Sequence, residues 1–147
     1  AELETHVAPV KRLSALLPRD VALGFHFCFG TFGGWPAFTP ADLTPAVNLV
    51  NAAVKAAGRR TDWIHFPALN RTDSDFYAPL AKIAAPEARL YLGMIHSMDS
   101  FAARLRAARV HVPAFGLAAY CGFGRTPPAE LPKILDDHLR AVELSKE

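Results

Sequence analysis

Short apolar runs alternate along this chain with longer segments in which apolar residues recur at helical spacing. The runs predict four strands, at residues 21–28, 62–66, 89–96 and 114–121. Helical periodicity follows the first three runs at residues 45–57, 76–83 and 101–110, and a last helix opens at Thr126 and Pro127. Helices between strands make the crossover connections that parallel strands need, so the pattern predicts an α/β fold with a parallel sheet.

Helix ends are marked by residues with known positional preferences. An amphipathic helix at residues 3–17 precedes the first strand and is stopped by Pro18. The helix after the first strand is predicted to have Thr44 as its N-cap, Pro45 in its first turn and Gly58 at its left-handed end. The last helix has an apolar stripe at Leu131, Ile134, Leu135, Leu139 and Val142.

Length and composition predict one soluble globular domain over residues 1–147, with 51% hydrophobic and 20% charged residues. The net charge is only +2, and Arg104, Arg106 and Arg109 are interpreted as a solvated helix face, so no nucleic acid partner is expected. No apolar run is long enough for a membrane span, and no signal peptide is visible. Two cysteines do not make a disulfide framework, which predicts a reducing, cytoplasmic location.

Candidate metal ligands occur in the first predicted strand and after the fourth. Strand alternation puts His26 and Cys28 on one face together with Gly24, and the apolar residues Leu23, Phe25 and Phe27 on the other. Cys121 ends the fourth run. Imidazole and thiolate are zinc ligands, and three protein ligands with one open position are typical of catalytic zinc. The alternative is that both cysteines are small buried hydrophobic residues.

Reactive side chains lie at or near the C-terminal end of every predicted strand; they are His26, Cys28, His65, His96 and Cys121. In a (β/α)₈ barrel these ends form one ring, where the active site lies, so the pattern favours a barrel over a doubly wound sheet. A barrel has eight strands and about 250 residues. Four strands therefore predict half of a TIM barrel, completed in a homodimer or by a missing N-terminal half-barrel.

The segments GFHFCFG, DWIHF, LYLGMIHS and YCGFGRTP, in this order and spacing, resemble the C-terminal half of the catalytic barrel of cobalamin-independent methionine synthase. The resemblance implies a zinc-dependent methyltransferase that acts on a thiol, with His26, Cys28 and Cys121 as zinc ligands and His96 near the reacting groups. The glutamate ligand of that family would fall at or near Pro67, which cannot bind a metal. His65 is a candidate substitute ligand.

His96 is the candidate for general acid–base catalysis, because a histidine of ordinary pKa near 6.5 can act either way at neutral pH. The alternative is a strand-end histidine that caps the next helix. Phe32 and Trp35, in and next to the glycine-rich loop at residues 30–34, are candidates for lining a small-molecule substrate pocket. Arg125 is a candidate for binding an anionic group.

Two further functions remain open at this stage. The related uroporphyrinogen decarboxylase-like barrels work without a metal and bind an anionic substrate through polar side chains and arginines. In that reading Arg125 and the aromatic loop carry the site, and the loss of the glutamate at Pro67 favours it. Alternatively, the chain is a non-catalytic half-barrel that needs a partner.

Overall fold

Four parallel strands form a single sheet in the order β1-β2-β3-β4 in the computed structural model, which describes residues 2–146. The strands are β1 (Gly24–His26), β2 (Trp63–Pro67), β3 (Arg89–Ile95) and β4 (Gly116–Ala119). The predicted α/β fold with a parallel sheet is therefore confirmed. The first and last residues of the predicted domain, 1 and 147, lie outside the described part.

Helices precede, connect and follow the strands. They are α1 (Glu2–Leu16), α2 (Thr44–Ala57), η1 (Ser74–Lys82), η2 (Met98–Ser100), α3 (Phe101–Arg109), η3 (Phe123–Arg125), η4 (Pro128–Glu130) and α4 (Leu131–Leu144). The helix predicted at 76–83 is the 3₁₀ helix η1, and the last helix begins only after the short turn η4. None of the helices within residues 2–146 is long and apolar enough to cross a membrane.

The ends of α2 correct one prediction and confirm another. Thr44 is the first helical residue rather than the N-cap, and the Asp42 side chain accepts its backbone N–H at 2.8 Å. The cap position belongs to Leu43, which is fully buried in the core. Gly58 ends the helix with a left-handed φ of 60°, as predicted, because glycine adopts this conformation without a steric penalty.

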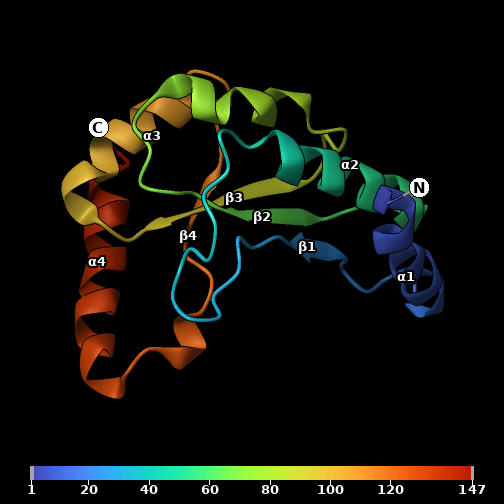
Figure 1. Cartoon of the computed structure of the whole chain (residues 1–147), viewed down its shortest axis with the longest axis horizontal. Helices are drawn as coiled ribbons and strands as arrows, with labels where there is room; N and C mark the ends of the chain where they lie inside the picture. Colours follow the sequence, from blue (N-terminus) through green and yellow to red (C-terminus); the bar gives the residue numbers. More distant parts are fainter. Residues whose placement is uncertain (1, 147) are drawn as a thin grey trace.

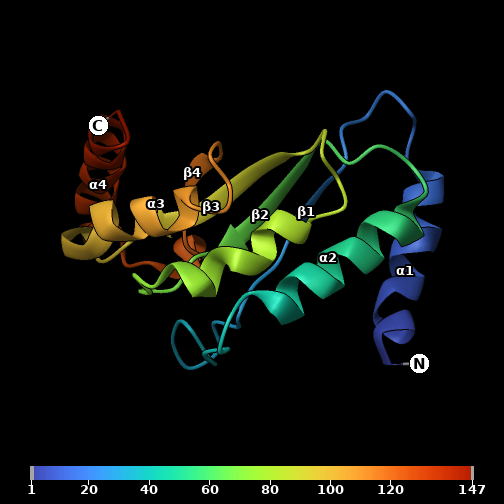
Figure 2. The ribbon, with the colours of Figure 1, turned by 90° about the horizontal axis from the view of Figure 1, so that it is seen from above.

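All three connections between strands cross the same face of the sheet (Figures 1 and 2). Helices α2, η1 and α3 cover that face. The strands turn Ile64, Phe66 and Leu92 toward them, and these side chains are at most 1% exposed. A doubly wound sheet would carry helices on both faces, so the consecutive strand order and one-sided helices separate this fold from that class.

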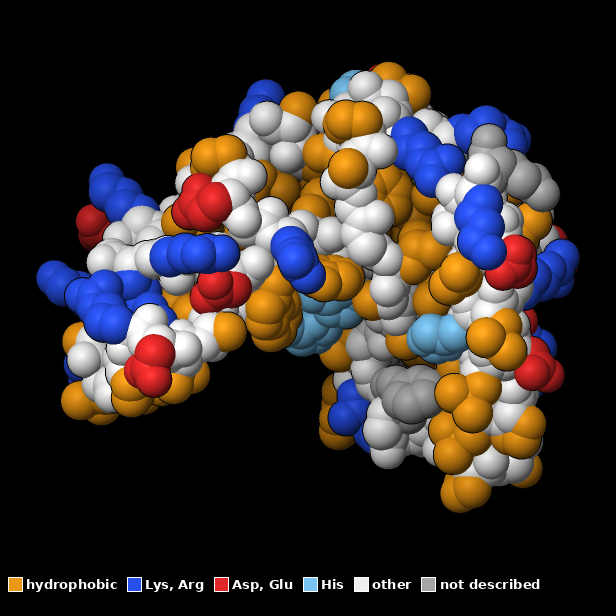
Figure 3. All heavy atoms as spheres, turned by 180° about the vertical axis from the view of Figure 1, so that it is seen from behind, with side chains coloured by type: hydrophobic (Ala, Val, Ile, Leu, Met, Phe, Trp, Pro, Cys, Tyr) orange, Lys and Arg blue, Asp and Glu red, His pale blue; other side chains and the backbone are white. Residues whose placement is uncertain are grey.

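The opposite face of the sheet carries the polar and aromatic side chains. Register pairs Gly24 with Trp63 and His26 with His65, and His65 in turn with Tyr91. Strand alternation puts these residues on the face away from α2 and α3. A hollow lies on this side between the ends of the molecule that carry α1 and α4 (Figure 3).

The apolar stripe of α4 is largely uncovered. Ala141 is the one residue of α4 that is fully buried in the described structure, whereas Leu139 is 69% exposed and Leu135 and Val142 are also exposed. The helix packs on β3 and β4 with Ala141 in the core and Leu144 against it, while Leu131 and Ile134 are half-buried. The hydrophobic pattern thus predicts the helix correctly, but it does not show that much of the apolar stripe is exposed.

Candidate metal centre

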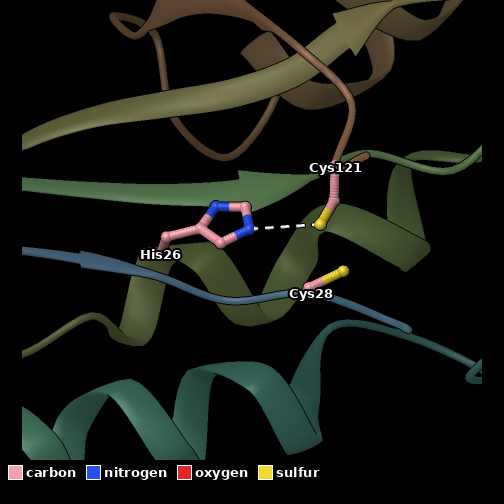
Figure 4. A group of neighbouring side chains, drawn as sticks. All are labelled: His26, Cys28 and Cys121. Carbon is pink, nitrogen blue, oxygen red and sulfur yellow. Dashed lines mark hydrogen bonds between the residues drawn. The ribbon is translucent and has the colours of Figure 1, made fainter. Parts of the chain in front are cut away.

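His26, Cys28 and Cys121 converge although the two cysteines are far apart in sequence (Figure 4). His26 is the last residue of β1, and Cys28 follows two residues later on the same side. Cys121 comes two residues after the end of β4. Their ligand-type atoms all lie within 4.8 Å of one another, and Nε2 of His26 is 3.4 Å from Sγ of Cys121.

This convergence depends on how the chain curves. Strands β1 and β4 are separated by β2 and β3, so three steps of about 4.8 Å would hold them about 14 Å apart in a flat sheet. The contact between His26 and Cys121 therefore requires that the sheet curve and the chain after β4 turn over its open face. Gly122, with φ of 99°, allows a backbone turn directly after Cys121.

The cluster is accessible from solvent. His26 and Cys28 are exposed, Cys121 is half-buried, and both thiols are free. The alternative reading, in which the cysteines are small buried hydrophobic residues, is therefore wrong for this structure. Accessible donor atoms suit a site that exchanges ions or ligands with solvent.

Burial favours the neutral forms of Cys121 and His26. Burial, followed by the neighbouring Cys28 thiol, raises the pKa of Cys121 to about 11, with Arg125 opposing the shift. Burial also lowers the pKa of His26. The imidazole is thus available as a neutral ligand, while a cation has to displace the Cys121 proton to bind the thiolate.

The donor set fits a metal ion of intermediate softness. One imidazole and two sulfur atoms match the ligands of zinc, and three protein ligands leave a position free for a further molecule. Pro67 is the last residue of β2 and is buried. Its hydrocarbon side chain has no atom that can bind a metal, so the position of the family's glutamate supplies no ligand. Among the described residues, His26, Cys28 and Cys121 form a group that could hold a metal ion.

His65 lies directly beside the cluster. Its ring is nearly parallel to that of His26, with an interplanar angle of 23°, and the two Nδ1 atoms are 2.7 Å apart. Burial, then the positive charge that His26 can carry, lowers the pKa of His65 to about 4, with the Ala119 carbonyl opposing the shift. His65 is therefore neutral at physiological pH and contacts the candidate ligand rather than the sulfur atoms.

His96 follows β3 and is held firmly by the backbone. Its Nε2 lies 2.6 Å from the Ala68 carbonyl oxygen, and its Nδ1 lies 3.3 Å from Oγ of Ser97. Burial, then the charge of Arg104, lowers the pKa of His96 to about 4. The expectation of an ordinary pKa near 6.5 is thus wrong: at neutral pH His96 is neutral and only a weak base, so it is suited to hydrogen bonding rather than to proton transfer.

Arg104 is fully buried, so the prediction that it lies on a solvated helix face is wrong. Arg106 and Arg109 of the same group are exposed, as that prediction requires. The position of Arg104 on α3 lies three residues after Phe101 and four before Ala108, in the middle of the buried stripe. This helical spacing was the signal that could have revealed it.

The Arg104 guanidinium donates to backbone carbonyl groups rather than to a carboxylate. It bonds to the carbonyl oxygens of His96 and Ser97, and its Nη1 lies 3.1 Å from Nε2 of His96. Ser97 has a left-handed φ of 44°, which is strained for a residue with a side chain. Arg104 therefore holds both the strained turn and the histidine that precedes it.

A cavity of about 700 Å³ adjoins the metal cluster. Its walls include Trp35, His96, Cys121 and Arg125, which places two of the three predicted substrate-binding residues around one space. The third, Phe32, is 100% exposed, so its predicted role in lining a pocket is wrong. Its loop turns the ring outward, because the glycines around it permit backbone directions that the sequence does not specify.

The walls of this cavity combine two arginines, the acidic Glu130, aromatic rings and small polar or apolar residues. Arg71 and Arg125 both reach it, and the Arg71 side chain is already paired with Asp73 at 2.7 Å. The Trp35 ring packs edge-on against the His96 ring with centres 4.8 Å apart. Nε1 of Trp35 is buried and has no hydrogen-bond partner among the described residues.

No protein-family model matches this chain, and neither a curated protein nor a solved structure shows significant similarity to it.

Proposed function

We propose that this chain is a zinc-dependent methyltransferase that acts on a small thiol, similar in its site to cobalamin-independent methionine synthase. The observation that carries the proposal is the convergence of His26, Cys28 and Cys121 within 4.8 Å. Cys121 also lines the adjoining cavity, so a molecule bound in the cavity can reach the cluster. The four sequence segments that resemble the family supply three of these positions and His96.

Zinc at this cluster would supply a Lewis acid that lowers the pKa of a thiol bound next to it. In the reaction, the substrate thiol loses its proton and its sulfur attacks a methyl carbon carried by a heteroatom of the donor. The new carbon–sulfur bond forms as the carbon–heteroatom bond breaks. The heteroatom keeps the electron pair and takes up a proton, which balances the transfer.

The protein side chains orient the substrate. His96, held at Nε2 by the Ala68 carbonyl, presents Nδ1 as a hydrogen-bond acceptor toward the reacting groups. Arg125 provides a cation for an anionic group on the substrate, and Trp35 provides an aromatic wall. We therefore infer a substrate that combines a thiol with a carboxylate or another small anionic group.

We further infer that the four βα units are half of a (β/α)₈ barrel. The consecutive strand order, the helices on one face and the reactive groups at one end of the strands all support this. Within residues 2–146, β1 and β4 are each paired on one side only, and Leu139 and Leu16 are exposed on the flanking helices. Four more strands, from a second copy or from an N-terminal half-barrel, would pair both edges.

Light scattering on the purified chain tests the barrel proposal. A dimer, or a monomer that associates with a separately supplied N-terminal half, is the expected result. A well-folded monomer that stays soluble at high concentration and binds neither partner would contradict it, because open strand edges normally promote association.

Metal analysis tests the function directly. Protein purified under reducing conditions should hold one zinc ion per chain, and Cys28→Ser or Cys121→Ser should lower zinc affinity by at least 10-fold. The His96→Gln variant is the matched control, since it changes the cavity but not the proposed ligands, and it should retain zinc while methyl transfer to a small thiol slows. Wild-type protein that binds no zinc with its thiols reduced would overturn the proposal.

A metal-free function is the second candidate, and the arginines around the cavity favour it. Arg71 and Arg125 at the walls could hold an anionic substrate, as the resemblance to uroporphyrinogen decarboxylase-like barrels implies. Thermal melting with small di- and tricarboxylates, in the presence of a chelator, distinguishes the metal-free function from the zinc-dependent one. Stabilisation that disappears in Arg125→Ala but is unaffected by Cys28→Ser would support this candidate over the zinc enzyme.

A further inference from the structure

The position of His65 next to the cluster results from strand pairing. His65 pairs with His26 in the parallel register of β1 and β2, so both side chains leave the sheet on its open face. His26 then has a different neighbour at each ring nitrogen. Nε2 lies 3.4 Å from Sγ of Cys121, and Nδ1 lies 2.7 Å from Nδ1 of His65.

The geometry of the two rings fits an N–H···N hydrogen bond. The ring centres are 4.8 Å apart at an interplanar angle of 23°, and their nearest nitrogens are much closer than the centres, so the rings meet edge to edge. Two nitrogens at 2.7 Å require one proton between them, because two lone pairs or two N–H groups would repel.

Binding of a cation decides which histidine donates that proton. A cation on Nε2 of His26 leaves the single proton of the neutral ring on Nδ1, which then donates to Nδ1 of His65. His65 then carries its own proton on Nε2, which is buried next to Gly93 and has no hydrogen-bond partner among the described residues. The hydrogen bond therefore links the cluster, through Nδ1 of His26, to His65.

The sheet leaves space for this arrangement. A Cβ atom at Gly93 would lie 3.0 Å from Nε2 of His65 and 2.8 Å from the Ala119 carbonyl oxygen. Any side chain at position 93 would therefore clash with the imidazole ring of His65. The absence of a side chain at Gly93 leaves the space that this ring occupies.

We propose that His65 is a positioning residue for the metal centre: it accepts a hydrogen bond from Nδ1 of His26 and so directs Nε2 of His26 to the cation. This inference rests on the proposed metal-dependent function, and it gives His65 a role other than that of a substitute ligand. Residues that orient a ligating histidine in this way typically account for 10- to 100-fold in metal affinity.

The matched variants His65→Asn and His65→Leu test the proposal. The two replacements have the same shape, but Asn keeps an acceptor at the place of Nδ1 and Leu does not. Zinc competition with a chromophoric chelator should show affinity about 10- to 100-fold weaker for His65→Leu, with His65→Asn within about threefold of the wild type. ¹⁵N NMR of the zinc-loaded wild type should show the His26 proton on Nδ1.

Each other outcome overturns a distinct claim. Wild-type protein without zinc overturns the proposed function itself. Wild-type protein with zinc, and His65→Leu with equal affinity, overturns the role of His65 alone. Equal losses in both variants also overturn it, because they would mean that His65 is a direct ligand or only fills space. Thermal melting of the metal-free variants detects a loss of fold that would otherwise imitate weak binding.

Discussion

Acidification should weaken the fold through His96 in a way that a single variant can isolate. The pKa of this histidine is about 4 in the folded protein, because burial and the Arg104 charge both disfavour its protonation. In the unfolded chain its pKa is about 6.5. The folded state therefore binds fewer protons between these values, so its stabilising contribution is complete above pH 6.5 and is lost as the pH falls toward 4.

The size of this effect follows from the two pKa values. Linkage gives a loss of about 2 kcal/mol between pH 7 and pH 5, and about 3 kcal/mol by pH 4, for this one group. His26 and His65 also have lowered pKa values, so the total loss in the wild type should be larger. The His96→Gln variant removes one titrating group while keeping an amide that can donate to the Ala68 carbonyl.

Urea unfolding followed by circular dichroism, at fixed ionic strength from pH 7.5 to pH 4.5, measures the effect. The free energy of unfolding should fall more steeply for the wild type than for His96→Gln, and the two curves should separate below pH 6.5. Parallel curves would refute the reasoning, because they would mean that His96 titrates alike in the folded and unfolded chains.

Three further predictions follow from single contacts. Gly93→Ala should destabilise the fold by about 2 kcal/mol in thermal or urea unfolding, because the added Cβ would lie 2.8 Å and 3.1 Å from backbone atoms of the neighbouring strands, which cannot move away. Gly124→Ala is the control and should have little effect, since the space around Gly124 is open. Arg104→Met should raise the pKa of His96 in an NMR titration, because a nearby positive charge is removed; an unchanged pKa would contradict this. Tyr77→Phe should cost about 1 kcal/mol in unfolding free energy, because the fully buried hydroxyl donates to a backbone carbonyl at 2.9 Å.

Periodicity predicted the elements better than their ends. The first strand was expected at residues 21–28 but pairs only over Gly24–His26. Just before it, Leu23 is bonded twice to Asp62: its N–H donates to the Asp62 carboxylate, and its carbonyl accepts the Asp62 backbone N–H. Apolar runs report which residues can form a strand, whereas the partners that decide its length come from other parts of the chain.

Those residues of the candidate site that lie at strand ends could be predicted from the sequence, because strand geometry alone fixes where they lie. Parallel strands bring their C-terminal ends to one edge, so His26 and Cys121 could be expected there from order and spacing. Phe32 could not be placed in the same way, because a glycine-rich loop allows many directions for the side chain. The charge of Arg104 favours an exposed position, whereas its place in the apolar stripe of α3 favours burial, and in the folded chain the stripe decides.

The sequence by itself determined the alternation of strands and helices and the chemical groups at the strand ends, because both depend on local spacing along the chain. Only the tertiary structure decided that the sheet curves enough to bring Cys121 to His26, that His65 lies at the second nitrogen of that ring, and that Arg104 is buried beneath His96. These features depend on contacts between residues far apart in the chain. The spacing of Arg104 in α3 indicates that it is buried, but only the fold places its charge beside His96, where burial and that charge lower the pKa of the histidine.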